Sequence, residues 1–110
     1  MYLHPEILEI LSNTDPDIFD LNFSSVRNAE RVLNYIEDIN LERTGRFEVT
    51  PDESLYMLWE VENWDFHIEC LKNGRMRYTF RKNGYGKIYG STGLEEFILL
   101  LEWYLLMEFR

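Results

Sequence analysis

Residues 65–90, DFHIECLKNGRMRYTFRKNGYGKIYG, decide the fold of this 110-residue chain. Apolar and polar side chains alternate through most of the stretch, which is the period of a β-strand with one buried face. The triplet Lys-Asn-Gly interrupts the alternation at residues 72–74 and again at residues 82–84. Asparagine and glycine tolerate the left-handed backbone of tight turns, so the stretch predicts three antiparallel strands joined by two hairpins.

The length of the first loop can be tested by the strand register that it would impose. A two-residue loop pairs Ile68 with Thr79, which puts the apolar sets on opposite faces of the sheet. A three-residue loop, with its glycine in the left-handed conformation, pairs Ile68 with Tyr78 and sets Glu69 opposite Arg77. Apolar partners and opposite charges then agree, so we expect the three-residue loop.

The second triplet predicts a second loop of the same design, which would pair Phe80 with Gly86 and Tyr78 with Ile88. The outer face of the two hairpins would then carry basic side chains interleaved with tyrosines. These residues are Arg75, Arg77, Arg81, Lys87, Tyr85 and Tyr89.

Helical patterns flank the strands on both sides. Pro5 suits the first turn of a short helix, and apolar residues at helical spacing predict a second helix over residues 25–42, capped by one of the serines before it. Strand alternation covers residues 47–49 and 55–61. A last helix is expected over residues 93–108, opened by a capping box between a threonine and a glutamate.

These elements together predict an α+β fold. It consists of two N-terminal helices, an antiparallel β-meander of four to five strands, and a C-terminal helix packed on the sheet, in a single domain over residues 1–110. The C-terminal helix is apolar almost all round, and a sheet covers only part of a helix. We therefore expect its excess apolar surface to meet the N-terminal helices or a second copy, with a homodimer formed through this helix or a sheet edge.

The charge of the chain is unevenly distributed. The formal net charge is −9, yet residues 72–94 hold six basic residues and no acidic one. An acidic surface repels nucleic acid and anionic lipid and attracts basic partners. The apolar runs are too short to span a bilayer, and the single cysteine fits a reducing compartment, so we expect a cytoplasmic protein with no membrane contact.

Residues that support catalysis or metal binding are scarce. Two histidines and one cysteine show no paired ligand spacing, and His67 and Cys70 fall on opposite strand faces. Cys70 belongs to the apolar set, where a thiolate is disfavoured. The chain has neither a Gly-x-Ser-x-Gly elbow nor a phosphate loop in the right context. We expect no catalytic residue, metal or cofactor, and a protein that is not an enzyme.

Two surfaces are candidates for binding a macromolecule. Acidic residues could face a basic groove as phosphates do, and this acidic set comprises Asp15, Asp17, Asp20, Glu37 and Asp38. The basic hairpin face could bind single-stranded nucleic acid by charge and stacking. The charge of −9 and the acidic cross-strand partners of two arginines make nucleic acid the less favoured partner.

Five short features of the chain form one pattern: Val49-x-Pro51, Leu55-x-x-x-Trp59-Glu60, Ile68-Glu69, Asn73-Gly74 and the late leucine-rich helix. This pattern resembles that of small bacterial and phage proteins, some of which are encoded beside toxin–antitoxin or anti-defence genes. The resemblance covers about half of the chain and carries no active-site residue.

The resemblance implies a binding role, as in an anti-CRISPR protein, an antitoxin or an immunity protein. The resulting hypothesis is a non-catalytic acidic protein that inhibits or sequesters a basic partner, for example one that binds nucleic acid. A single-stranded nucleic-acid-binding module and a small enzyme with a pocket under the sheet are the alternatives.

Overall fold

In the part of the chain that the structure describes, five strands form one antiparallel sheet in which each strand pairs with the next, in the order β1-β2-β3-β4-β5. The computed structural model describes residues 4–15, 17, 21–39 and 45–109, with the backbone alone for residues 87 and 107–109. The strands are β1 (Glu48–Val49), β2 (Leu55–Val61), β3 (Trp64–Cys70), β4 (Met76–Lys82) and β5 (Tyr85–Thr92). The helices are α1 (Pro5–Asn13), α2 (Phe23–Asp38) and α3 (Leu94–Phe109). The predicted α+β meander between N-terminal helices and a C-terminal helix is confirmed.

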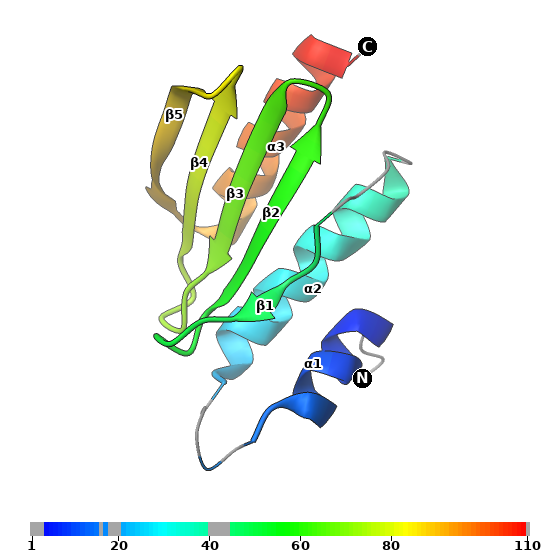
Figure 1. Ribbon diagram of the computed structural model, residues 1–110, viewed down its shortest axis with the longest axis vertical. Helices are drawn as coiled ribbons and strands as arrows, with labels where there is room; N and C mark the ends of the chain where they lie inside the picture. The colour runs from blue at the N-terminus through cyan, green and yellow to red at the C-terminus, as the bar shows by residue number, and fades with distance from the viewer. Residues whose placement is uncertain (1–3, 16, 18–20, 40–44, 110) are drawn as a thin grey trace.

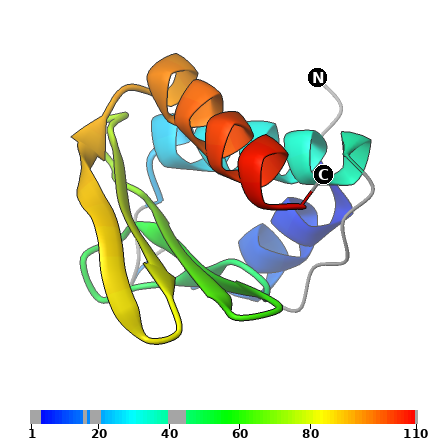
Figure 2. The same cartoon turned by 90° about the horizontal axis from the view of Figure 1, so that it is seen from above.

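The helices and the sheet form two layers (Figures 1 and 2). α2 and α3 lie side by side on one face of the sheet, and α1 packs beside α2 near β1. The opposite face carries no helix among the described residues. This open face must therefore present side chains that tolerate water.

An aromatic cluster fills the space between the sheet and α3. Phe80 is fully buried, and its ring centroid lies 5.0 Å from that of Phe66 and 5.4 Å from that of Tyr78. From α3, the rings of Phe97 and Tyr104 lie 6.2 Å and 5.5 Å from Phe80. Edge-to-face and tilted arrangements at these distances are favourable, so Phe80 joins the sheet to the last helix.

The helix boundaries differ in detail from those expected. The N-cap of α2 is Asn22, whose side chain accepts a hydrogen bond from the N–H of Ser24 at 2.7 Å, so a serine cap is wrong. α2 ends at Asp38, and residues 40–42 of its predicted extension lie outside the described residues. At the start of α3 the hydroxyl of Thr92 donates to Glu96, one residue beyond the expected capping partner.

The first hairpin has the expected register. Cys70 pairs with Met76, and Ile68 pairs with Tyr78. Gly74 has a φ of +87° and donates its N–H to a loop carbonyl at 3.0 Å, as a three-residue loop with a left-handed glycine requires.

The expected register of the second hairpin is wrong. Asn83 and Gly84 both adopt positive φ, 55° and 81°, and form a two-residue loop that pairs Lys82 with Tyr85. Two consecutive left-handed residues make a type I′ turn, whose twist matches that of the strands. A β-bulge follows, so that Phe80 pairs with Ile88 instead of Gly86.

The bulge places Ile88 and Gly90 on the buried face of the sheet. Ile88 lies beside Phe80, and Gly90 lies opposite Tyr78. A Cβ atom at Gly90 would be 2.9 Å from the hydroxyl oxygen of Tyr78, so the tyrosine needs a glycine there. The predicted register would have put glycine beside Phe80 and left Tyr78 against isoleucine.

The bulge also separates the two tyrosines of the predicted basic face. Tyr89 pairs with Thr79 on the open face, whereas Tyr85 pairs with Lys82, whose ammonium lies 5.8 Å from the centre of the Trp64 ring. Since paired residues share a face of the sheet, Tyr85 and Tyr89 lie on opposite faces. The expected joint stacking surface is therefore not formed.

We expect Phe80→Ala to lower the free energy of unfolding by about 3–5 kcal/mol, because it removes the ring that four aromatic side chains contact. Tyr89→Ala is the control, because Tyr89 is 82% exposed on the next strand, and its expected effect is within about 0.5 kcal/mol. Urea denaturation followed by circular dichroism measures both. Equal losses would contradict the assigned packing.

Candidate functional site

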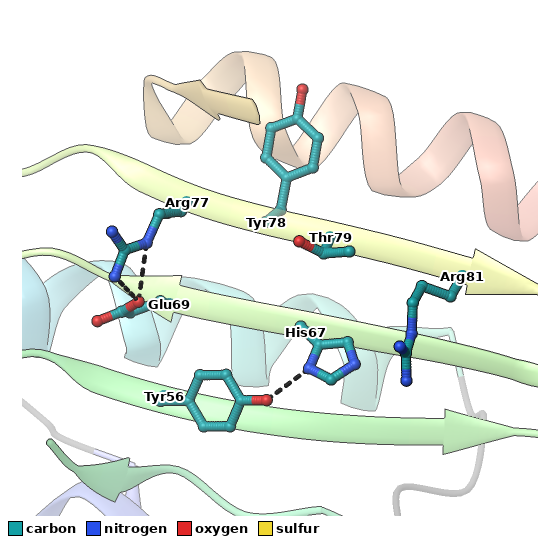
Figure 3. Close-up of a pocket in the computed structure, with 7 residues that line it drawn as sticks. All are labelled: Tyr56, His67, Glu69, Arg77, Tyr78, Thr79 and Arg81. Carbon is teal, nitrogen blue, oxygen red and sulfur yellow. Dashed lines mark hydrogen bonds and ion pairs between the residues drawn. The ribbon is translucent and has the colours of Figure 1, made fainter. Parts of the chain in front are cut away.

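The open face of the sheet is hollowed over β2, β3 and β4. The hollow has a volume of about 290 Å³. Its lining residues are Tyr56, His67, Glu69, Arg77, Tyr78, Thr79 and Arg81. Figure 3 shows that these side chains come from three neighbouring strands, and that Tyr78 points the other way, towards α3.

Two arginines of the hollow are held by carboxylates on the adjacent strand, as the register predicts. Arg77 donates from Nε and Nη2 to one oxygen of Glu69, at 3.0 Å and 2.5 Å. The other carboxylate oxygen of Glu69 accepts from the Ser54 hydroxyl, and Glu69 is only 8% exposed. Arg81 donates to Asp65 at 3.1 Å. These contacts neutralise the positive charge of both arginines locally.

The other basic side chains of this region also have partners. Arg75 donates to the hydroxyl and the carbonyl of Ser91, at 3.2 Å and 2.9 Å. Lys72 pairs with Glu53 at 3.1 Å, and Lys82 lies over the Trp64 ring. The side chain of Lys87 lies outside the described residues. A phosphate chain on this face would have to compete with existing contacts for each arginine.

His67 and Tyr56 form the only uncharged hydrogen-bonded pair of side chains in the lining of this hollow that the structure describes. The Tyr56 hydroxyl oxygen lies 2.5 Å from His67 Nδ1. Burial lowers the pKa of His67, and the nearby Arg81 guanidinium lowers it further. Burial and the Glu69 carboxylate raise the pKa of Tyr56. Both side chains are therefore uncharged near neutral pH.

The nitrogen of His67 that is not bonded to Tyr56 is covered by its neighbours. His67 Nε2 and Arg81 Nε are both buried and have no hydrogen-bond partner among the described residues. A general acid or base must reach its substrate within hydrogen-bond distance. In this arrangement the free imidazole nitrogen does not open into the hollow.

The acidic set is not brought together. Asp15 and Asp17 lie before the N-terminus of α2, whereas Glu37 and Asp38 lie in its last turn. A 16-residue helix places its two ends roughly 22 Å apart at a rise of 1.5 Å per residue. Glu37 also contacts His4 at 2.5 Å. Asp20 lies outside the described residues.

α3 presents an apolar surface on the side that faces away from the sheet. Phe97, Leu101 and Leu105 are buried against the core. On the opposite side, Leu99, Trp103 and Leu106 are 67%, 63% and 39% exposed, and we call these three residues the α3 stripe. The sequence pattern of this helix is apolar almost all round and does not indicate which residues point outward.

The α3 stripe lies between carboxylates. At 100° per residue, Glu95 and Glu102 fall along one edge of the stripe and Glu96 falls along the other. Arg31 of α2 reaches Glu95 at 3.3 Å, which shows that the first edge is the one nearer to α2. The surface thus combines apolar side chains with an acidic border.

The described residues contain no other group with obvious chemistry. Cys70 is fully buried, and burial raises the pKa of its thiol well above the ordinary value. Nowhere in residues 4–15, 17, 21–39 and 45–109 do three or more His, Cys, Asp or Glu side chains gather as a metal site would require. Across the same residues no helix is long and apolar enough to cross a membrane.

Comparison of the chain with known protein families, curated proteins and solved structures finds no match.

We expect the imidazole of His67 to titrate below the ordinary pKa of about 6.5 in NMR spectra of the folded protein. Arg81→Gln raises this pKa by removing a nearby positive charge, whereas Arg75→Gln, outside the hollow lining, leaves it unchanged. At pH values well above 6.5 the imidazole of His67 is neutral in both the folded and the unfolded protein. As the pH falls below about 6.5, the unfolded chain binds a proton at His67 before the folded protein does. The free energy of unfolding therefore falls as the pH approaches the pKa of His67 in the folded protein. A His67 pKa above 6.5 would contradict the buried placement.

The thiol of Cys70 should react with iodoacetamide only after the protein opens. Because the sulfur is fully buried and its thiolate is disfavoured, we expect native protein to be alkylated roughly a thousandfold more slowly than protein unfolded in urea. Mass spectrometry measures the rate directly, since the chain has one cysteine. Equal rates in the two states would show an accessible thiol.

Proposed function

We propose that this chain is a non-catalytic binding protein that inhibits or sequesters a protein partner with a basic surface. The observation that carries the proposal is the way charge is distributed over the described surface. The described basic side chains of the hairpins are held in contacts within the chain, whereas many described carboxylates face solvent and pair with no described cation.

Exposed carboxylates occur over several elements of the fold. Those that form no ion pair with any described residue include Asp17, Asp38, Glu48, Asp52 and Glu62. With a net charge of −9, these groups produce a negative field around the molecule. Such a field accelerates encounter with a basic protein and disfavours nucleic acid.

The two alternative functions, nucleic-acid binding and catalysis, have less support from the described contacts. Nucleic-acid binding by the hairpins would require Arg77 and Arg81 to leave Glu69 and Asp65, and it would lose Tyr85 from the stacking face. An enzyme using the hollow would need the buried nitrogen of His67 to become accessible.

Affinity capture from a lysate of the organism that encodes the chain tests the proposal. We expect basic proteins to be enriched and to be released near 1 M salt, where the Debye length falls to about 3 Å. The triple variant E48Q/D52N/E62Q should capture less, because it removes exposed negative charge. Arg75→Gln is the control, because it changes the charge by one unit in the opposite direction.

Two outcomes would overturn the proposal. One is recovery of no basic protein by the unmodified chain. The other is a mobility shift of single-stranded oligo-dT at low salt that the variant R77Q/R81Q abolishes, since this would assign the hairpins to nucleic acid.

A further inference from the structure

We propose that the α3 stripe is the docking site for a single amphipathic helix of the basic partner, an inference that rests on the proposed function. The helix would place apolar side chains on Leu99, Trp103 and Leu106 and would place lysines or arginines against the carboxylates on both borders. An amphipathic helix presents such apolar anchors at positions i, i+3, i+4 and i+7, so its apolar face can pack along the stripe.

The exposure of the stripe is the first support. Residues 97, 101 and 105 already bury one side of α3 against the sheet, and the stripe lies on the opposite side. Figure 2 shows α3 as the outermost described element on this side of the molecule, with no other described helix or strand over it. Large apolar side chains exposed in a row along one helix typically mark an interaction site.

The dimensions of the stripe favour a narrow occupant. From Leu99 to Leu106 it runs for about 10 Å along the helix axis, and three side chains expose at most a few hundred Å². A stable dimer of standard size buries about 800 Å² on each partner. A helix is about 10 Å wide, so one helix covers the stripe.

Charge decides between a basic helix and a second copy of the chain. Glu95, Glu96 and Glu102 border the stripe, and each copy carries a net charge of −9. Two copies joined through this face would bring their acidic borders together, which is repulsive. Basic side chains of a partner would instead meet carboxylates on both sides, and the exposed Arg31–Glu95 pair offers little resistance to exchange.

Trp103 provides both an anchor and a reporter. Tryptophan is enriched among the residues that dominate binding energy at interfaces. The other two tryptophans, Trp59 and Trp64, are 0% and 2% exposed, so a change in solvent exposure is expected at Trp103 alone.

The experiment uses the full chain and three synthetic peptides of about five helical turns. The first is a leucine–lysine peptide with leucines on one helical face, the second has the same composition in scrambled order, and the third keeps the leucine face but replaces lysine by glutamine. Fluorescence emission of Trp103 and calorimetry report binding. We expect the first peptide to shift the emission to shorter wavelength and to bind about tenfold more tightly than either of the others.

Matched variants locate the site. Leu99→Ser keeps the Trp103 reporter and should reduce the affinity for the first peptide to that for the scrambled one, because it interrupts the stripe. Leu8→Ser is the control, because Leu8 is an exposed apolar residue of α1 that lies off the stripe. The affinity of the Leu8→Ser variant for the first peptide should equal that of the unmodified chain. Circular dichroism checks that both variants fold.

The possible outcomes separate the two proposals. Equal binding of the ordered and scrambled lysine peptides, unaffected by Leu99→Ser, overturns the helix site and leaves the proposed function standing. Equal binding of the lysine and glutamine peptides, or binding of none, also overturns the helix site, whereas the proposed function is decided by the lysate capture. Sedimentation that shows a dimer, dissociated by Leu99→Ser, would identify a second copy of the chain as the occupant of the stripe. A shift of the Trp103 emission on addition of phosphatidylcholine vesicles would identify a lipid surface as the occupant. Either result overturns the inference.

Discussion

The left-handed glycine of the first hairpin loop is the constraint on which the rest of this structure depends. Gly74 closes a three-residue loop, and this length decides that Cys70 lies opposite Met76. Because side chains alternate along a strand, a shift of one residue would send every apolar side chain of β4 to the open face. The aromatic cluster around Phe80 and the Glu69–Arg77 pair both follow from this one register.

The two faces of the sheet place opposite demands on the sequence. The covered face excludes water and is filled by aromatic and aliphatic side chains from β2, β3 and β4. The open face has no covering layer among the described residues, and there Glu69 and Asp65 hold the arginines of the adjacent strand. Internal pairing on that face leaves the remaining carboxylates of the chain to set its external field. The electrostatic character of the surface is thus a consequence of how the sheet is covered.

Much of the fold could be predicted because local patterns agree with it. Alternation predicted the strands, and the pairing of Ile68 with Tyr78 could be chosen over Ile68 with Thr79 by charge and polarity alone. The predicted register of the second hairpin was wrong because the Lys-Asn-Gly triplet is compatible with two loop lengths. The choice depends on tertiary packing, since Ile88 and Gly90 must fit Phe80 and Tyr78.

The candidate surfaces were harder to foresee. Asp15 and Asp17 precede α2 whereas Glu37 and Asp38 lie in its last turn, so the length of the helix keeps the two groups apart. The α3 stripe carries no periodic signal, because buried and exposed positions of that helix are equally apolar. Only the packing of Phe97 and Leu101 on the sheet identifies the opposite side as the exposed one.

The bulge in β5 has a further consequence for the behaviour of the protein at high concentration. β5 is the last strand of the sheet, so its outer edge offers backbone N–H and C=O groups to any chain that approaches. A straight edge of this kind is a template on which copies can add strand by strand into fibrils. The bulge interrupts the regular spacing of those groups and increases the local twist, which makes the edge a poor template. The irregularity that packs Ile88 against the core therefore also protects the molecule against polymerisation.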